Sequence, residues 1–246
     1  MLKDHSNTRQ EDVLSMIVKR YVETAEPVGS RYIARKLGLS SATIRNVMSD
    51  LEESGYISHP HTSAGRMPTD KGYRYYIDSL MRLKDINEET AISIRKEYKE
   101  AMRSIEDILE RTSHMISHIT NYVGITLFSE YHKLYLDGAS HIIEQPEFRD
   151  LKKLHMILQY LEEKRNLLDL LYVDVDSDRL TIHIGKENQF SSLKDCSIVT
   201  RGYKVKGKVS GRLGVIGPKR MVYEKVIPTL DFLADSITEI LEEIED

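Results

Sequence analysis

The feature that most constrains the fold is a run of three short helical segments, each with its own cap, between residues 8 and 54. Thr8 and Glu11 have the spacing of a capping box, and the apolar residues that follow them share one helical face. This pattern predicts a first helix, which Pro27 and Gly29 bring to an end.

Two further helices are predicted, with only a short turn between them. Ser30 is a candidate N-cap for a helix over 31–37, which Gly38 would close in the left-handed conformation. Ser40 is a candidate cap for a third helix, which ends before Gly55. Two helices joined by a turn of about three residues form the helix-turn-helix arrangement.

The third helix has two unlike faces. At helical spacing its apolar residues fall on one side: Ile44, Val47, Met48 and Leu51. The opposite side is small and polar: Ala42, Arg45, Asn46 and Ser49. In a major groove, arginine reads guanine and asparagine reads adenine through paired hydrogen bonds. A solvated helix in any small bundle has the same kind of face, so the helix alone leaves both interpretations open.

The segment after the third helix favours DNA binding. Residues 56–58 are predicted to form a short strand, 59–66 a loop rich in turn formers, and Met67 the start of a return strand. Such a strand, basic loop and strand form a wing, whose side chains can bond phosphates or enter the minor groove. Residues 27–76 also carry seven basic and four acidic side chains, although the chain has a net charge of −4.

These segments supply the candidate DNA-binding residues. The predicted set is Ser30, Arg31, Ser41, Ala42, Thr43, Arg45, Asn46, Ser49, His61, Thr62, Ser63, Arg66, Lys71 and Arg74. Lys71 and Arg74 lie on the first turns of the helix that follows the wing, close enough to add phosphate contacts. His59 and His61 have no cysteine or third histidine nearby in the sequence to complete a tetrahedral site, so a turn without metal is expected.

Residues 84–120 are predicted to form one long connecting helix. Apolar positions spaced alternately four and three apart give a heptad seam: Ile94, Tyr98, Ala101, Ile105, Ile108, Thr112, Met115 and Ile119. The seam either packs on the chain's own domain or pairs with its twin across a two-fold axis. Both interpretations are open, and the second makes this segment a dimerisation helix.

From residue 121 onward, strand-like runs alternate with helices, as in an α+β domain. Strands are expected at 123–128, 134–136, 180–184, 197–205 and 208–216. Pro146 suits the first turn of a helix, and a final helix with an apolar face begins near Met221. The chain is therefore predicted to divide into a winged helix-turn-helix domain at 1–83, a connecting helix at 84–120 and an α+β domain at 121–246.

Several classes of function find no support in the sequence. It contains no phosphate-binding loop, zinc-binding helix motif or nucleophile elbow, so neither an enzyme nor a cofactor is expected. The glycines between 211 and 217 suit a hairpin and a strand-to-helix turn, or, less readily, an anion cradle. No run approaches the roughly 18 apolar residues of a membrane helix. A single cysteine, Cys196, fits a reducing compartment, so a cytoplasmic protein is expected.

Long, nearly ungapped stretches at both ends of the chain are similar in sequence to one known family. They are 26–31, 37–46, 50–56, 60–76, 146–148, 184–188, 195–197 and 214–223. On these segments the chain resembles the heat-inducible transcription repressors called HrcA. The resemblance implies a homodimer that binds an inverted-repeat operator, called CIRCE, upstream of chaperone operons. It also implies modulation by a GroEL-type chaperonin and a GAF-like C-terminal domain.

One departure from the family concerns the middle of the C-terminal region. Family members are usually longer and carry an inserted dimerising domain there. Here the sequence passes from 121–125 to 133–138 with almost nothing between, so the chain resembles a shortened member without that domain.

Two other functions share these features. A ligand-responsive regulator would bind a metabolite in the C-terminal domain, which a thermal shift against a metabolite panel would detect. An RNA-binding protein would use the winged helix on RNA, and competition with duplex DNA would separate it from a repressor.

Overall fold

Three helices build the apolar core of the N-terminal part of the chain. They are α1 (Leu2–Thr24), α2 (Ser30–Leu37) and α3 (Ser41–Glu53). Each of them contributes fully buried side chains, among them Ile17, Ile33 and Ile44. The computed structural model describes residues 2–61, 64–101, 104–130, 132–173 and 177–245. The chain divides into two units, Met1–Arg82 and Leu83–Asp246, each with its own core.

The turn between α2 and α3 is held by its caps. Gly38 closes α2 with a φ of 66°, in the predicted left-handed conformation. The hydroxyl of Ser40 accepts a hydrogen bond of 3.0 Å from the backbone N–H of Thr43. A helix start has free N–H groups, and this bond satisfies one of them.

Two predicted helix starts are wrong. The first helix begins at Leu2 rather than at Thr8, since no glycine or proline precedes Thr8 to delay it. The N-cap of α2 is Gly29, which has extended backbone and makes no side-chain cap, so Ser30 is the first helical residue.

The predicted wing follows α3. Strands β1 (Ile57–Ser58) and β2 (Met67–Pro68) pair antiparallel, and Val28 forms an additional bridge to Arg66. The unit ends with α4 (Asp70–Tyr75), capped by the Thr69 hydroxyl, and the π-helical turn η1 (Tyr76–Leu80).

A five-stranded antiparallel sheet forms the centre of the second unit. Its strands are β3 (Val123–Phe128), β4 (Lys133–Asp137), β5 (Leu180–Ile184), β6 (Cys196–Val205) and β7 (Lys208–Pro218). They lie in the order β4-β3-β7-β6-β5, and all five predicted strands are confirmed. The expected α+β fold is therefore present.

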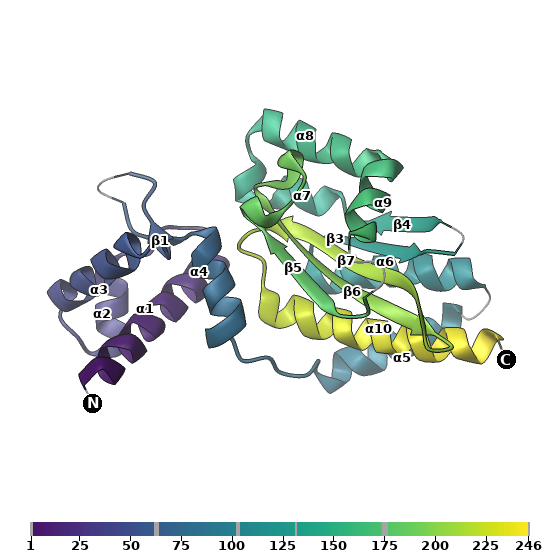
Figure 1. Cartoon of the computed structure of the whole chain (residues 1–246), viewed down its shortest axis with the longest axis horizontal. Helices are drawn as coiled ribbons and strands as arrows, with labels where there is room; N and C mark the ends of the chain where they lie inside the picture. Colours follow the sequence, from purple (N-terminus) through teal and green to yellow (C-terminus); the bar gives the residue numbers. More distant parts are fainter. Residues whose placement is uncertain (1, 62–63, 102–103, 131, 174–176, 246) are drawn as a thin grey trace. The chain divides into compact units, whose positions relative to one another are not determined.

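Helices cover both faces of this sheet (Figure 1). On one face lie α6 (Ile105–Thr120) and α10 (Tyr223–Glu245). On the other lie α7 (Ser140–Glu144), α8 (Leu151–Glu162) and α9 (Lys164–Tyr172). Short 3-10 turns join these elements: η2 (Pro146–Phe148), η3 (Gly185–Glu187) and η4 (Ser191–Leu193). Pro146 thus opens a 3-10 turn and not the predicted helix, because Asp150 caps a separate helix, α8.

The predicted long connecting helix is wrong. Residues 84–120 contain two helices, α5 (Glu88–Ala101) and α6, and Ser104 has extended backbone and caps the second. Seam residues of both helices are buried inside the unit, including Ile94, Ile108 and Met115; the side chain of Ala101 lies outside the described residues. The seam therefore packs on its own domain and is not a free surface for pairing with a second chain.

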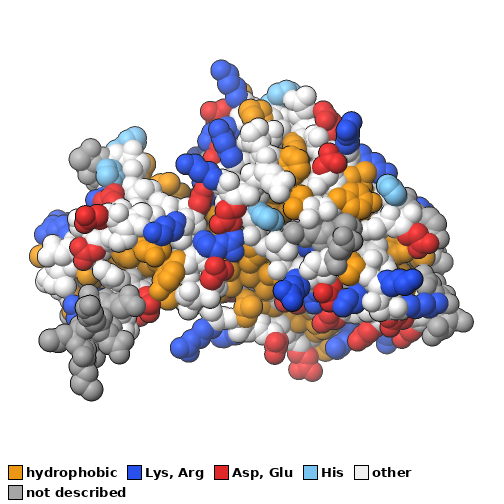
Figure 2. Space-filling view, in the orientation of Figure 1, with side chains coloured by type: hydrophobic (Ala, Val, Ile, Leu, Met, Phe, Trp, Pro, Cys, Tyr) orange, Lys and Arg blue, Asp and Glu red, His pale blue; other side chains and the backbone are white. Residues whose placement is uncertain are grey.

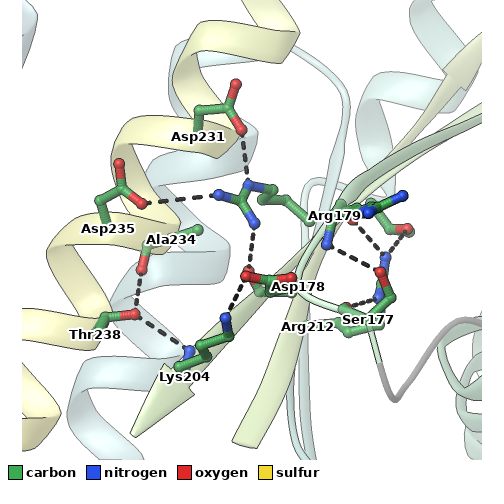
Figure 3. A network of polar contacts seen from close by, with 12 residues as sticks. Ser177, Asp178, Arg179, Lys204, Arg212, Asp231, Ala234, Asp235 and Thr238 are labelled. Atoms are coloured by element: carbon green, nitrogen blue, oxygen red, sulfur yellow. Dashed lines mark hydrogen bonds and ion pairs between the residues drawn. The ribbon is translucent and has the colours of Figure 1, made fainter. Parts of the chain in front are cut away.

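A polar network ties α10 to the sheet (Figure 3). Arg201 of β6 bonds Asp231 at 2.8 Å, and the backbone N–H of Lys204 donates to the Thr238 hydroxyl. The Lys204 ammonium contacts Asp178 at 2.6 Å. Arg201 therefore balances part of the acidic character of the C-terminal helix.

Among the described helices, none has the length and apolar character needed to cross a bilayer.

Candidate nucleic-acid interface

The two faces of α3 differ in the structure as they do in the sequence. The apolar side is sealed in the unit, with Ile44 fully buried and Val47, Met48 and Leu51 nearly so. The polar side is exposed: Ala42, Arg45, Asn46 and Ser49. This arrangement confirms the predicted division of the helix. It leaves one guanidinium and one carboxamide, the two groups suited to base edges, open for contact.

The start of α3 is more enclosed than its middle. Ser41 and Thr43 are half-buried, and the Thr43 hydroxyl lies 2.8 Å from the cap hydroxyl of Ser40. This contact fixes the Thr43 side chain beside the helix start. A hydroxyl and free N–H groups at a helix N-terminus form a common contact for a DNA phosphate.

The second helix carries exposed basic residues beyond the predicted set. Arg35 and Lys36 are exposed in the last turn of α2, and the predicted Arg31 is exposed one turn earlier. Arg31 and Arg35 are four residues apart, which places them on the same helical face. That spacing is the signal that would have identified Arg35 from the predicted Arg31. The predicted Ser30 is half-buried.

The tip of the wing is described only in part. Thr62 and Ser63, both predicted contacts, lie outside the described residues. His61 is exposed, and its carbonyl oxygen accepts a hydrogen bond of 2.9 Å from the N–H of Ala64. This bond joins the described residues on either side of the tip.

Arg66 lies at the base of the wing and is already engaged there. Its Nη2 lies 2.8 Å from Glu52 of α3, and its Nη1 donates to the carbonyl oxygen of Ala64. The same Glu52 carboxylate contacts Nδ1 of His59 on the other side of the wing. Figure 2 shows histidine and acidic side chains close together at the wing end of this unit. No local spacing in the sequence points to this cluster, because its three members come from a helix and from the two ends of a loop.

The neighbouring basic side chains lower the pKa of the Glu52 carboxyl. Burial raises its pKa, but the hydrogen bond from His59 and the positive charge of Arg66 outweigh burial and lower the pKa overall. Glu52 is therefore a carboxylate near neutral pH, held between two basic side chains.

Lys71 and Arg74 also have partners within the unit. The Lys71 ammonium donates a hydrogen bond of 2.8 Å to the carbonyl oxygen of Ser54 and lies 4.4 Å from the ring centroid of Tyr56. Arg74 pairs with Asp78 at 3.4 Å, one turn along the chain. The structure thus places the Lys71 ammonium at the C-terminal end of α3, and the Arg74 guanidinium beside Asp78.

Metal binding finds no support in the described ranges, where no three side chains of His, Cys, Asp or Glu gather at one point.

Comparison with known proteins places both units in one group. Residues 6–79 match the family model for the winged helix-turn-helix transcription repressor, HrcA DNA-binding, and residues 126–227 match the model for the HrcA protein C-terminal domain. The heat-inducible transcription repressor HrcA of Desulforamulus reducens is 32% identical over 96% of this chain and 97% of its own length. The protein of the same name from Pelotomaculum thermopropionicum is also 32% identical, with the same coverage.

The lengths of these relatives differ from that of this chain. Both alignments run over 337 residues, whereas the chain has 246, so the relatives carry residues inside the aligned span that are missing here. The chain is thus shorter than these relatives.

One solved structure shares the fold. A crystal structure of a hypothetical protein superposes with a TM-score of 0.74 over 96% of this chain and 98% of its own, at 19% identity.

Proposed function

The chain belongs to the HrcA family of heat-inducible transcription repressors as a shortened member, and from this premise we propose that it represses by placing α3 in the major groove of an inverted-repeat operator. A member of this family is a DNA-binding repressor and not an enzyme. The observation that carries the proposal is the exposed polar face of α3 over its sealed apolar face.

The proposed contacts fall into two groups. Arg45 and Asn46 read base edges, with Ala42 and Ser49 allowing close approach of the helix. The remaining predicted residues contact the sugar-phosphate backbone: Ser30, Arg31, Ser41, Thr43, His61, Thr62, Ser63, Arg66, Lys71 and Arg74. Arg35 joins this second group because it shares the exposed face of Arg31. Phosphate contacts set the register and most of the affinity, and base contacts set the sequence.

An inverted repeat calls for two heads, and we propose that the repressor acts as a homodimer. The relatives' additional residues are missing here, and the seam of α5 and α6 is buried within its unit, so the contact must use another surface. Sedimentation of the full chain and of a chain truncated after Leu83 tests this. A truncated chain that remains fully dimeric would exclude the second unit from the interface.

The family resemblance also implies regulation by a GroEL-type chaperonin. We propose that the chaperonin maintains the active repressor in the cytoplasm, where its DNA target lies, and that heat relieves repression as the active form is lost. Operator affinity that stays constant through the heat-shock range, with and without chaperonin, would contradict this.

A gel shift tests the central proposal. Purified protein is titrated on a duplex carrying the inverted repeat, at two salt concentrations, against a duplex with one half-site scrambled. We expect tight binding only to the intact repeat, weakened steeply by salt. Equal binding to both duplexes, or preferential release by competitor RNA, would overturn the proposed operator.

A further inference from the structure

The carboxylate of Glu52 joins the recognition helix to both sides of the wing. Glu52 lies in the last turn of α3, His59 follows β1, and Arg66 precedes β2. One carboxylate oxygen contacts Nδ1 of His59 and the other lies 2.8 Å from Nη2 of Arg66. The Glu52 and Arg66 side chains are only 25% and 24% exposed, which strengthens a charged contact relative to one in open solvent.

The strands of the wing are short. Strands β1 and β2 pair over two residues each, and a hairpin of that length is marginally stable by itself. Additional support comes through Arg66, whose backbone N–H and C=O both bond Val28, at 2.9 and 2.8 Å. Gly65 approaches the same segment so closely that a side-chain carbon there would lie 2.7 Å from the carbonyl carbon of Pro27. The base of the wing is therefore a junction of three segments.

The direction of the wing depends on this junction. His59 and Arg66, at the two ends of the loop, are held by the same carboxylate. If that carboxylate is lost, the base is still held by the two-residue ladder, the Val28 bridge and the hydrogen bond from the Thr69 N–H to the Tyr56 carbonyl oxygen. The wing would then sample more orientations, and each phosphate contact at its tip would cost more entropy to form.

We propose that Glu52 is a positioning residue of the DNA-binding head, which holds His59 and Arg66 so that the wing meets the DNA backbone in one fixed orientation. This inference rests on the proposed binding of duplex DNA and adds an acidic residue to the determinants of that binding. Arg66 then acts mainly by anchoring the wing, and its guanidinium contributes through Glu52.

Removal of the Glu52 charge should change DNA affinity in the direction opposite to that expected from electrostatic repulsion alone. Removing a negative charge from a surface near DNA reduces repulsion of the phosphates and should tighten binding. Removing the Glu52 charge should weaken binding, because the orientation of the wing is lost. The adjacent Glu53 is exposed and supplies a matched control with the same charge change one residue away.

The experiment compares E52Q and E53Q in the full chain on the inverted-repeat duplex at one salt concentration. We expect E52Q to weaken binding about tenfold, the scale of one lost charge-assisted hydrogen bond, and E53Q to leave it unchanged or slightly tighter. E52D, which keeps the charge but shortens the side chain, should also weaken binding. Thermal unfolding of each variant verifies that it is folded. If E52Q does not fold, the binding of E52D tests the proposal in its place.

A double-mutant cycle tests the role given to Arg66. If Glu52 and Arg66 act as one unit, E52Q/R66M should bind about as weakly as either single variant, whereas independent contacts would multiply their losses. Amide hydrogen exchange at Val28 and Arg66 should also accelerate in E52Q but not in E53Q. Binding by E52Q equal to that by E53Q, or multiplicative losses, would overturn the proposal. Failure of the wild-type chain to bind the duplex would instead overturn the proposed function.

Discussion

The ammonium group of Lys71 donates a hydrogen bond to the carbonyl oxygen of Ser54, the residue that caps the C-terminal end of α3. A positive charge at this position interacts favourably with the helix dipole, and the contact with the Tyr56 ring adds a cation–π interaction. Lys71 therefore stabilises the helix that carries the proposed base-reading residues.

Replacing Lys71 by methionine should lower the free energy of unfolding of the N-terminal unit by about 1 kcal/mol, the sum expected for these two interactions. Urea unfolding followed by circular dichroism measures this, and K19M, at an exposed position of α1, is the control. A K71M variant as stable as K19M would contradict the cap. The predicted phosphate contact is tested separately. If Lys71 makes it, K71M should reduce the salt dependence of operator binding by about one ion.

Arg45 and Arg35 should differ in how their loss affects DNA binding. R45A should cost about 1–3 kcal/mol of discrimination between the operator and a duplex changed at one half-site position, because a base contact is lost. R35A, the control on α2, should weaken binding to both duplexes similarly and flatten the salt dependence. Titrations of both duplexes at two salt concentrations separate the outcomes. Uniform weakening by R45A would place Arg45 on the backbone instead.

Gly72 is required by the packing of α4 against the start of β1. A side-chain carbon at this position would overlap the carbonyl oxygen of Tyr56, and a backbone atom cannot move aside as a flexible side chain can. G72A should therefore destabilise the N-terminal unit by about 3 kcal/mol. G29A is the control, because Gly29 has open space around it and a φ of −82°, and it should change stability by less than about 1 kcal/mol. Equal effects of the two changes would contradict the packing described here.

The thiol of Cys196 should resist modification until the second unit unfolds. Burial raises its pKa from 9.0 to about 12, and the side chain is fully buried in the core beneath α8 and α9. Labelling with a disulfide reagent at pH 8 should be slow in buffer and fast in urea. Labelling at the same rate in both would show that the thiol is accessible in the native state.

The same shift predicts a pH dependence of stability. The pKa of the thiol is higher in the folded than in the unfolded state. The contribution of the Cys196 thiol to folding stability is therefore fully present below about pH 9 and is lost as the pH rises toward 12. C196A, measured over that range, should lose less stability with rising pH than the wild-type chain. A parallel decline in both proteins would assign the loss to other groups.

The sequence predicted the parts of the fold that depend on local spacing. The caps at Gly38 and Ser40, the two faces of α3 and all five strands of the sheet follow from residues within one turn or one strand of each other. The exposed set around Arg45 could be named for the same reason.

The errors come from contacts that spacing does not encode. Residues 84–120 contain no glycine or proline, and the heptad seam continues through the break, so one helix was expected where α5 and α6 form. Periodicity cannot show that the two halves of a seam face each other, as Tyr98 and Thr112 do through hydroxyls 2.8 Å apart. Similarly, the link from Glu52 to Arg66 joins a helix to the far side of a loop and exists only after the wing has folded.

The separation of the chain into two units, each burying its own apolar residues, has a consequence for a repressor that responds to heat. Calorimetry on such a chain can yield two melting transitions, because neither core requires the other to remain intact. Warming can then inactivate the repressor in two ways: by unfolding the N-terminal unit that binds the operator, or by unfolding the second unit of the same chain while the N-terminal unit stays folded. If heat relieves repression by unfolding, we expect the controlled genes to be released at the lower of the two melting temperatures.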